Sequence, residues 1–453
     1  MRIAVIHPSM LPKGGAERVV MWLCAALQER GHAVTLITSD YDEYWGSREA
    51  LGFPVVEFGV HGIEWRRNTI QDWHDAADRL RPLLAGFDVV NPHNYPAYVW
   101  AQWAREGLPE AERPPIVWFC EEPYRAFYGK LTDTHCAEAD RLRAVDPIFV
   151  QARAEARVVA TSSPPHKRLI ERAKRILRPF DINALFQQAE AIDRETVPKL
   201  DLILGNSGFI ASNVTKVFSV PARPCHLGIP IEDIGPEDVE RRPFLLAVTR
   251  LHPAKNVDGC LRAVAALRDR GSLPFERFVI VGDGPERAYL EAVSRLLAID
   301  DVVDFRGFAS DAEVRELYRT AAAVIYVPLD ETFGLPFLEA AEFRKAVVGP
   351  SVGGPAELVV DGVTGLVVDP LDSRAIADAV ARLFTDPELA RTLGEAGHAR
   401  LLEHFTFEKF VDRFEGELGT LSGIGAEAPT ARGSLCTVDR DRETITEPRE
   451  GHR

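Results

Sequence analysis

The chain is organised around one stretch, Leu329-Asp-Glu-Thr-Phe-Gly-Leu-Pro-Phe-Leu-Glu-Ala-Ala341, which follows an apolar run from Ala323 to Pro328. We interpret that run as a buried parallel strand that ends in the loop. Pro336 opens a helical pattern at a position where its missing N–H costs little, so Gly334 and Leu335 lie at a helix N-terminus. Unpaired backbone N–H groups and the helix dipole favour phosphate there. The stretch therefore predicts an anion-binding loop.

Two carboxylates flank this loop. Glu331 precedes the glycine, and Glu339 lies about one turn into the predicted helix. A carboxylate beside a bound nucleotide can accept hydrogen bonds from both hydroxyls of a ribose. The second of the two glutamates is then available to contact a sugar. The alternative interpretation is that Glu331 is an ordinary loop residue and Glu339 a first-turn glutamate favoured by the helix dipole.

Composition limits the classes of protein. The 453 residues suffice for two domains, and a hydrophobic content of 46% supplies both cores. A net charge of −15 argues against general binding to nucleic acid or to an anionic membrane. No apolar stretch approaches the roughly 20 residues that cross a bilayer, and the chain enters a strand directly at Met1, so we expect a cytoplasmic protein. The six cysteines are dispersed without metal-ligand spacing, which indicates reduced thiols.

The N-terminal half alternates strands with helices. Arg2 to Pro8 is a predicted strand, Gly14 to Arg30 a helix, and His32 to Ser39 a second strand, which together form a βαβ unit. Between the first strand and its helix, Gly14 and Gly15 allow backbone amides to face a ligand, although glycine pairs are also common in turns. The repeated alternation predicts parallel sheets with ligands at the carboxyl ends of the strands.

Polar side chains follow several of the later strands. His93 lies just past the strand at Phe87 to Asn91, and Glu121, Glu122 and Arg125 follow the strand at Pro115 to Cys120. Each of these residues can instead cap or hydrogen-bond a loop. Later strands are expected at Leu200 to Gly205 and near Pro224 to Ile229, with Asn206 and Ser207 opening the helix between them. Ser207 is equally explained as an N-cap.

The second half begins after a linker, Ile231 to Arg242. The strand Pro243 to Leu251 delivers Arg250 and Lys255, two cations that can stabilise a leaving diphosphate in place of a metal, although both can simply be solvated. The next strand runs into Gly282-Asp-Gly284, a loop that suits phosphate or ribose.

A basic segment stands out in this acidic chain. Residues 165–178 place leucines and isoleucines on one helical face and six lysines and arginines mostly elsewhere. This segment either contacts an anionic membrane surface near a lipid-linked acceptor or packs against the first domain. The charged tail, residues 422–453, is predicted to be disordered.

Three motifs together resemble one family. Residues 331–340, Ser351-Val-Gly-Gly-Pro-Ala-Glu357 and Asp361-Gly-Val-Thr-Gly365 resemble the E-x7-E signature region of the retaining GT-B glycosyltransferases of family four. The resemblance implies an α/β GT-B fold in which two Rossmann-like, doubly wound parallel-sheet domains face each other across a cleft. The implied divisions are an acceptor domain (1–230), a linker (231–242), a nucleotide-sugar domain (243–404) and a helix (405–421) that returns to the first domain.

The resemblance also implies roles for individual residues. By this resemblance, Arg250 and Lys255 are expected to hold the diphosphate of a nucleotide sugar, Glu331 the sugar and Glu339 the ribose. No metal or other cofactor is expected to be required. The other residues expected at the donor are Gly14, Gly15, Gly282, Gly284, Phe308, Phe333, Gly334 and Leu335. Phe308 and its neighbours face the nucleobase in the family; otherwise Phe308 is a core residue.

One loop departs from the family pattern. Many members carry a histidine where this chain has Glu121, and the resemblance implies that His93, Glu121 and Arg125 contact the sugar or the acceptor. The donor is GDP- or UDP-linked. We favour GDP-mannose, because the Cys-Glu-Glu-Pro loop resembles the Cys-His-x-Pro loop of some mannosyltransferases. The expected acceptor is a glycan or lipid-linked hydroxyl, and no nucleic-acid partner is expected.

Other functions were weighed. Asp40-Tyr-Asp42 has the letters of a metal-dependent transferase motif but lies in an acidic loop, and the glycine loop after the first strand lacks the G-x-G-x-x-G of a dehydrogenase. A non-catalytic nucleotide-sugar-binding partner, hinted at by Glu121, and a nucleotide-sugar epimerase on the same fold stay open.

Overall fold

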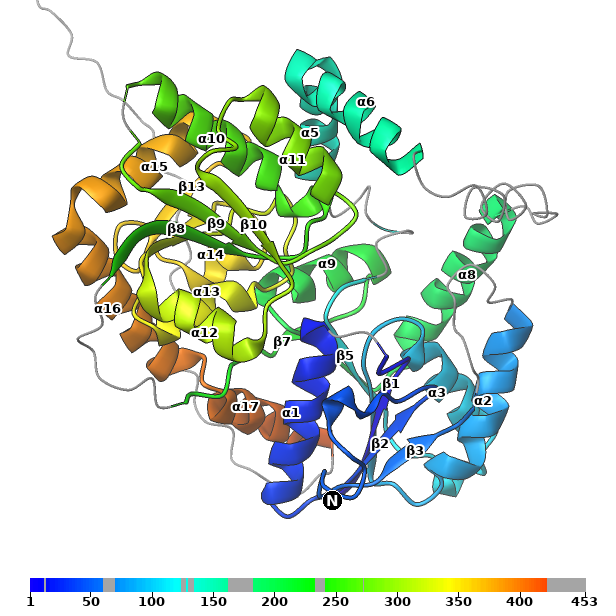
Figure 1. Cartoon of the computed structure of the whole chain (residues 1–453). Coiled ribbons are helices and arrows are strands. Elements are labelled where there is room, and N and C mark those ends of the chain that lie inside the picture. The colour runs from blue at the N-terminus through cyan, green and yellow to red at the C-terminus, as the bar shows by residue number, and fades with distance from the viewer. Residues whose placement is uncertain are drawn as a thin grey trace, which may run out of the picture.

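The computed structural model describes residues 1–11, 14–59, 70–123, 128, 134–161, 182–232, 241–271 and 273–421. Two α/β units, one built on the first strands and one on the later strands, lie side by side (Figure 1). Every strand pair is parallel, as the alternation of strands and helices predicts.

The first unit contains two short sheets that meet. Their orders are β3-β2-β1-β4 and β5-β6-β7. Isolated bridges from Val90 to Ile116 and from His93 to Phe119 join β4 to β5, so the strands form one continuous layer. The strands are β1 (Arg2–His7), β2 (Ala33–Thr38), β3 (Val55–Glu57), β4 (Val89–Pro92), β5 (Val117–Cys120), β6 (Leu202–Gly205) and β7 (Arg223–Pro224).

The second unit is a six-stranded sheet of order β10-β9-β8-β11-β12-β13. Its central strands are buried on both faces, because helices cover both sides of a doubly wound sheet. The strands are β8 (Arg242–Val248), β9 (Arg277–Val281), β10 (Val303–Gly307), β11 (Ala321–Ile325), β12 (Val347–Pro350) and β13 (Leu366–Val368).

The helices connect successive strands. In the first half they are α1 (Gly15–Glu29), α2 (Ile70–Leu84), α3 (Ala97–Glu106), α5 (Thr134–Val145), α6 (Pro147–Thr161), α8 (Ile182–Thr196) and α9 (Gly208–Phe218). In the second half they are α10 (Val257–Asp269), α11 (Arg287–Leu296), α12 (Asp311–Thr320), α13 (Leu335–Glu342), α14 (Pro355–Leu358), α15 (Ser373–Thr385), α16 (Pro387–His404) and α17 (Phe407–Leu421). The predicted strand near Pro224 to Ile229 is shorter than expected, since β7 contains two residues.

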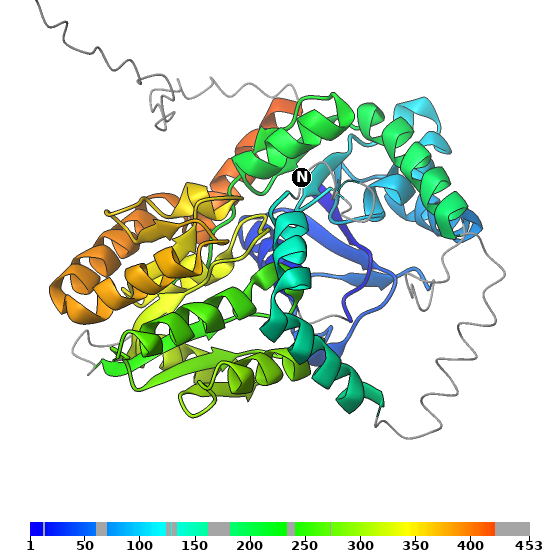
Figure 2. The same ribbon diagram turned by 90° about the horizontal axis from the view of Figure 1, so that it is seen from above.

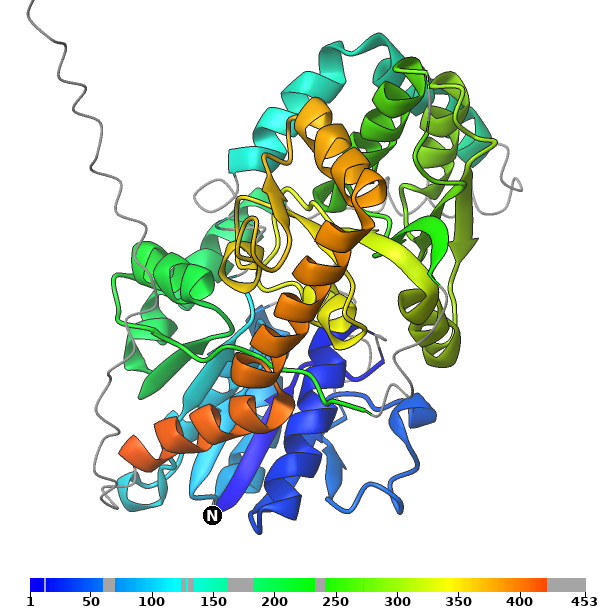
Figure 3. The ribbon, with the colours of Figure 1, turned by 90° about the vertical axis from the view of Figure 1, so that its left-hand side faces the viewer.

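The last helix joins the second half of the chain to the first sheet. Figure 3 shows α16 running down from the second unit into α17, which lies beside α1. Phe410, Phe414 and Leu418 are fully buried at the i, i+4 and i+8 positions of α17, and Phe410 and Phe414 pack against Phe119 of β5. The helix that the sequence predicted to return to the first domain therefore contacts its sheet.

One segment lies where the sequence did not predict it. Residues 1–230 were assigned to the N-terminal domain, but α5 and α6 pack against the second unit, beside α10 and α11 (Figures 1 and 2). Phe149 and Ala152 of α6 are buried in the core of that unit. The sequence did not predict this docking of residues 134–161, because the contacts pair residues more than a hundred positions apart, which no local pattern encodes.

Three predictions lie outside the described residues: the role of Arg125, the basic segment 165–178 and the tail 422–453. Within the described ranges, no helix is both long and apolar enough to span a bilayer.

Candidate active site

Lys255 and Glu331 meet at the carboxyl end of the second sheet. Lys255 ends a 3-10 turn (Pro253–Lys255) that follows β8, and its Nζ donates to Glu331 Oε2 at 2.7 Å. Tyr326 donates its hydroxyl to the same oxygen. Burial acts to raise the pKa of Glu331, but the Lys255 charge and the hydrogen bonds from Lys255, Tyr326 and Thr332 together lower that pKa. Burial acts to lower the pKa of Lys255, but its interactions with Glu331 and Tyr326 raise that pKa. Both Lys255 and Glu331 are therefore charged. Lys255 and Glu331, two predicted site residues that are 76 positions apart in the sequence, are thus in direct contact.

The loop after β11 opens helix α13 as predicted. Gly334 is the N-cap at φ 104°, a conformation that favours glycine, and a Cβ there would lie 2.7 Å from the Phe337 ring. Leu335 and Pro336 begin the helix. Phe333 is 2% exposed and packs near Phe405, so its ring belongs to the core and its backbone alone is available to a ligand.

Glu339 is held by two side chains. The Tyr318 hydroxyl donates to its Oε2 at 3.0 Å, and Arg18 Nη1 lies 3.7 Å from its Oε1. Burial raises the pKa of Glu339, and Arg18 opposes that rise. Arg18 comes from α1 and also lies 3.6 Å from Asp311 of α12. No signal in the sequence indicated a role for Arg18, which bridges the two halves.

The glycine loop of the first half faces α13. A Cβ on Gly15 would lie 3.4 Å from Leu335 Cδ1, so the start of α1 approaches the start of α13. The backbone N–H of Gly14 donates to Glu17 Oε2 at 3.1 Å. The two loops that the sequence predicted at the donor therefore lie opposite each other.

Four further predicted residues lie at neighbouring strand ends. A Cβ on Gly282 would collide with the carbonyl oxygen of Thr249, and one on Gly284 with that of Leu251, so this loop packs directly on the backbone around Arg250. Arg250 itself is exposed, and its guanidinium has no ion pair within the described ranges. Phe308 is 77% exposed beside Gly307, so it is a surface residue and not a core phenylalanine.

A second polar cluster lies at the ends of β1, β4 and β5. Asn91 donates its amide to Val117 O at 2.7 Å, so its Oδ1 accepts from His93 Nε2 at 2.9 Å. His93 is fully buried, which lowers its pKa to about 3 and keeps the ring neutral. A neutral ring that donates from Nε2 presents Nδ1 as an acceptor. That atom lies 3.7 Å from Glu121 Oε1, and neither atom has a hydrogen-bond partner among the described residues.

The same arrangement recurs at the other end of the cluster. His7 Nδ1 donates to Ser9 O at 2.9 Å, and burial lowers the His7 pKa to about 3, so its Nε2 is an acceptor. It receives Asn94 Nδ2 at 3.1 Å and lies 3.9 Å from Glu17 Oε1. Burial raises the pKa of Glu17 to about 7.

The cluster is therefore rich in acceptors and poor in donors. Burial likewise raises the pKa of Glu121 to about 7, and the Asn94 amide partly opposes that rise. When Glu17 and Glu121 are ionised, a ligand group that fits here must bring N–H or O–H donors, as a sugar hydroxyl does. The sequence predicted His93 and Glu121 separately but not their mutual orientation, and it missed His7 and Glu17.

A third contact closes the two halves on each other. Ser207 caps α9 by accepting from Ile210 N, and its hydroxyl donates to Thr332 O at 2.7 Å. Asn206 Nδ2 lies 3.3 Å from Thr332 Oγ1. Ser207 is therefore an N-cap, as one interpretation of the sequence had it, and it also contacts the second half.

Glu357 completes this contact. Its carboxylate accepts from the backbone N–H groups of Gly208 (2.9 Å) and Phe209 (2.6 Å) and from His226 Nε2 (2.7 Å). Burial acts to raise the Glu357 pKa, but these donors lower it. The motif that contains Glu357 was recognised from the sequence, whereas its contact with α9 was not.

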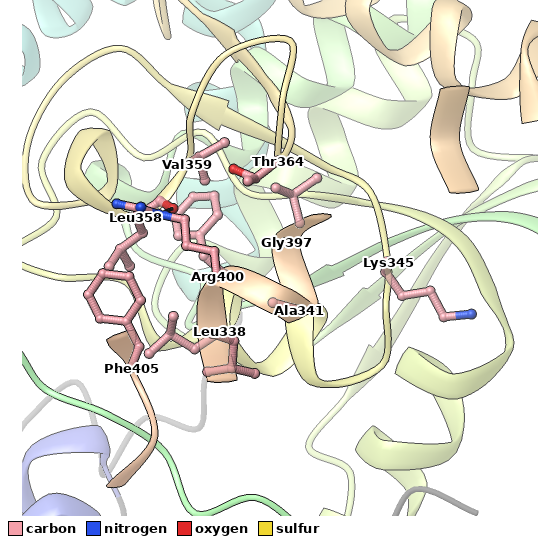
Figure 4. Close-up of a pocket in the computed structure, with 12 residues that line it drawn as sticks. Leu338, Ala341, Lys345, Leu358, Val359, Thr364, Gly397, Arg400 and Phe405 are labelled. Atoms are coloured by element: carbon pink, nitrogen blue, oxygen red, sulfur yellow. Dashed lines mark hydrogen bonds between the residues drawn. The ribbon is translucent and has the colours of Figure 1, made fainter. Parts of the chain in front are cut away.

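Two other features do not join the site. Asp42 caps a short 3-10 turn, and Asp40 accepts from the Ser39 hydroxyl; Asp40 is buried and not solvated as an acidic loop predicts. Among the described residues, no group of three or more His, Cys, Asp or Glu side chains is arranged to hold a metal ion. A small cavity between α13 and α16 is lined mainly by apolar residues such as Leu338, Leu358 and Phe405, while Lys345 points away from them (Figure 4). It contains none of the predicted donor residues, and we assign it to packing.

Comparisons with known proteins bear on this geometry. Residues 13–228 match the family described as Glycosyltransferase Family 4, and residues 232–400 match the glycosyl transferases group 1. The human alpha-1,3/1,6-mannosyltransferase ALG2 is 26% identical over 441 residues, which cover 91% of this chain and 94% of that protein.

Partial matches are more similar but shorter. An alpha-D-kanosaminyltransferase of Streptomyces kanamyceticus is 34% identical over 41% of this chain and 46% of its own length. A GDP-mannose-dependent alpha-(1-6)-phosphatidylinositol monomannoside mannosyltransferase of Mycolicibacterium smegmatis is 36% identical over 36% of this chain and 44% of its own length. This chain thus spans less than half the length of these two relatives.

Solved structures agree on the fold. Anabaena HepE in complex with UDP superimposes with a TM-score of 0.64 at 17% identity, covering 93% of this chain and all of that protein. The GT-B fold predicted from the sequence is therefore confirmed.

Proposed function

The chain belongs to the glycosyltransferases of family four, with a group 1 C-terminal half, and from that membership we propose a specific reaction. It moves a hexose, preferably mannose, from a nucleotide diphosphate sugar to a hydroxyl of a glycan or lipid-linked acceptor. Transfer proceeds with retention at the anomeric carbon and without a metal ion. The mannosyltransferase names of two relatives support the choice of sugar.

One observation carries the proposal. The Lys255–Glu331 pair lies beside the N-terminus of α13, which faces the Gly14–Gly15 loop of the other half. An ammonium and a helix N-terminus stabilise the charge that a leaving diphosphate accumulates, and Arg250 at the same strand end adds a second cation. In the proposed step, the bond from the anomeric carbon to the phosphate oxygen breaks. The acceptor oxygen bonds to the same face, and its proton passes to the leaving phosphate.

The other residues are proposed to bind and orient. Glu331 accepts sugar hydroxyls through Oε1, whose described contact is the adjacent Thr332 N–H at 3.0 Å. Glu339 accepts the ribose hydroxyls. The backbone around Gly14, Gly15, Phe333, Gly334 and Leu335, the loop Gly282–Gly284 and the exposed Phe308 ring complete the donor site.

The acceptor-rich cluster is proposed to read hydroxyls. A substrate hydroxyl placed between Glu121 and His93 donates its hydrogen to one of these two unpaired atoms, His93 Nδ1 or Glu121 Oε1, and a protonated Glu121 donates to the hydroxyl oxygen. A deoxy substrate leaves these atoms unpaired and is therefore expected to bind more weakly. Arg125 is proposed as a further contact.

A ligand panel tests the donor assignment. Thermal unfolding is measured with GDP-mannose, UDP-glucose, UDP-N-acetylglucosamine and ADP-glucose in a buffer that contains EDTA. A ligand that binds the native state raises its apparent stability, by about 2.7 kcal/mol at a hundredfold excess over Kd. We expect GDP-mannose to give the largest rise. If no nucleotide sugar changes the transition, the proposed donor site is wrong.

A further inference from the structure

The helix pair α5–α6 comes from the first half of the sequence but is bound to the second unit. Figure 2 shows the pair lying along the helices of that unit. Its contacts include three arginine–carboxylate pairs: Arg143 with Asp258, Arg153 with Glu286, and Arg262 with Asp146. In two of these pairs, the carboxylate (Asp258 or Glu286) lies directly beside a loop that carries proposed donor groups.

The first pair fixes the turn that presents Lys255. Arg143 is 9% exposed and donates Nε and Nη2 to the two oxygens of Asp258 at 2.6 and 2.7 Å. Its Nη2 also donates to Pro253 O at 3.1 Å. Pro253 begins the turn that ends at Lys255, and Asp258 lies in the first turn of α10 directly after it. A bidentate fork fixes geometry as well as charge, so both sides of the turn are held.

The second pair holds the neighbouring loop. Arg153 donates to Glu286 Oε1 at 2.7 Å, and its guanidinium lies 3.7 Å from the centre of the Tyr289 ring. Glu286 follows Gly284 and donates its backbone N–H to Leu251 O at 3.2 Å. The Gly282–Glu286 loop and the strand end around Arg250 are thereby fixed to each other and to α6.

We propose that Arg143 is a positioning residue for the donor diphosphate, because it holds the Pro253–Lys255 turn in place so that Lys255 meets Glu331. Arg153 in turn is proposed to hold the Gly282–Glu286 loop in place. The inference rests on the proposed function, because it takes Lys255 to be the diphosphate ligand. Groups that bind a substrate must be held to within about 0.5 Å of their productive positions to bind it fully. Contacts from the α5–α6 pair to both loops supply that restraint. The donor site is then built by both halves of the sequence.

A matched pair of variants tests this. Arg143→Gln and Arg262→Gln each remove one arginine–carboxylate contact of the α5–α6 pair. The Arg262 guanidinium contacts Asp146 and lies 4.5 Å from the centre of the Phe149 ring, away from both loops. Calorimetric titration compares GDP with GMP for the wild type and both variants, or UDP with UMP if the wild type prefers uridine. We expect Arg143→Gln to weaken GDP about tenfold and GMP less than about twofold, while Arg262→Gln leaves the ratio unchanged.

Additional variants separate positioning from folding. Arg143→Gln leaves Asp258 buried with a charge, so the double variant Arg143→Gln/Asp258→Asn removes that charge and is titrated if the single variant fails to fold. Arg143→Lys keeps the charge without the fork and is expected to bind GDP with intermediate affinity. Arg153→Gln is expected to weaken GDP selectively as well.

The outcomes are distinct. If the folded Arg143 variants bind GDP as the wild type does, or lose GDP and GMP equally, the positioning role is refuted while the proposed function stands. If the wild type binds no nucleoside diphosphate, both proposals fall.

Discussion

Lys255→Met removes an ammonium that lies 2.7 Å from Glu331 and leaves that carboxylate with the Tyr326 hydroxyl and the Thr332 N–H. The side chains of the pair are 24% and 14% exposed, so solvent replaces the lost charge poorly. Removing one partner of a buried pair costs about 3–5 kcal/mol, and we expect a loss of that order in the free energy of unfolding. Because the same ammonium is proposed to stabilise the leaving diphosphate, kcat/KM should fall roughly 10²- to 10³-fold.

The substitution should also reverse a pH dependence. In the wild type Lys255 lowers the pKa of Glu331, so the pair stabilises the fold above the unfolded pKa of glutamate and the effect is lost as pH falls through the folded value. Without Lys255, burial is opposed only by the hydrogen bonds from Tyr326 and Thr332, and we expect the pKa of Glu331 to rise above its usual value. The variant should then lose stability as pH rises. Urea unfolding in steps from about pH 3 to about pH 8 measures both slopes, since the free energy of unfolding changes with pH wherever the two states bind different numbers of protons.

A double variant separates stability from activity. Lys255→Met/Glu331→Gln removes both charges, so we expect it to recover most of the lost stability while activity stays low. The reasoning is refuted if Lys255→Met unfolds like the wild type with the same pH slope, or if it keeps full activity.

Three further substitutions test other parts of the account. Gly282→Ala places a Cβ against the Thr249 carbonyl at φ +124°, so we expect a loss of about 1–3 kcal/mol in urea unfolding, and an unchanged midpoint would contradict the close packing. Burial raises the Glu121 pKa to about 7, so the folded state holds this proton more tightly and wild-type stability should fall as pH rises from about 4.5 to about 7. Glu121→Gln should flatten part of that fall in a thermal-unfolding pH series, and an identical slope would argue against the raised pKa. Glu357→Ala removes the acceptor for the N–H groups of Gly208 and Phe209 and for His226. We therefore expect the two halves to separate more readily and the radius of gyration from X-ray scattering to rise. An unchanged radius would argue that this contact does not hold the halves together.

The sequence predicted the elements because local patterns encode them. Apolar runs, glycine loops and Pro336 located the strand, loop and helix at residues 321–342 to within a few positions. That Lys255 and Glu331 lie in one region also followed, since both come at the carboxyl ends of parallel strands, which meet at one edge of a sheet, whereas their direct ion pair was not predicted. Local signals thus suffice where topology forces the convergence.

Long-range side-chain pairs were not predictable in this way. Arg143 meets Asp258 across 115 positions, and nothing in the helical pattern of α5 distinguishes a surface that docks on a distant helix from one exposed to solvent. Arg18 reaches Glu339 for the same reason. His93 and Glu121 were found from strand ends, but the acceptor character of His93 Nδ1 depends on the hydrogen bonds of Asn91, which only the three-dimensional arrangement supplies.

Proton NMR of a single reaction tests the central claim most directly. The purified protein is incubated with GDP-mannose and an alkyl mannoside in buffer that contains EDTA, and the anomeric signals are followed over time. The account predicts release of GDP together with a new glycoside of α configuration. A β-linked product, an isomerised nucleotide sugar, or no consumption of this donor or of a UDP-sugar would contradict it.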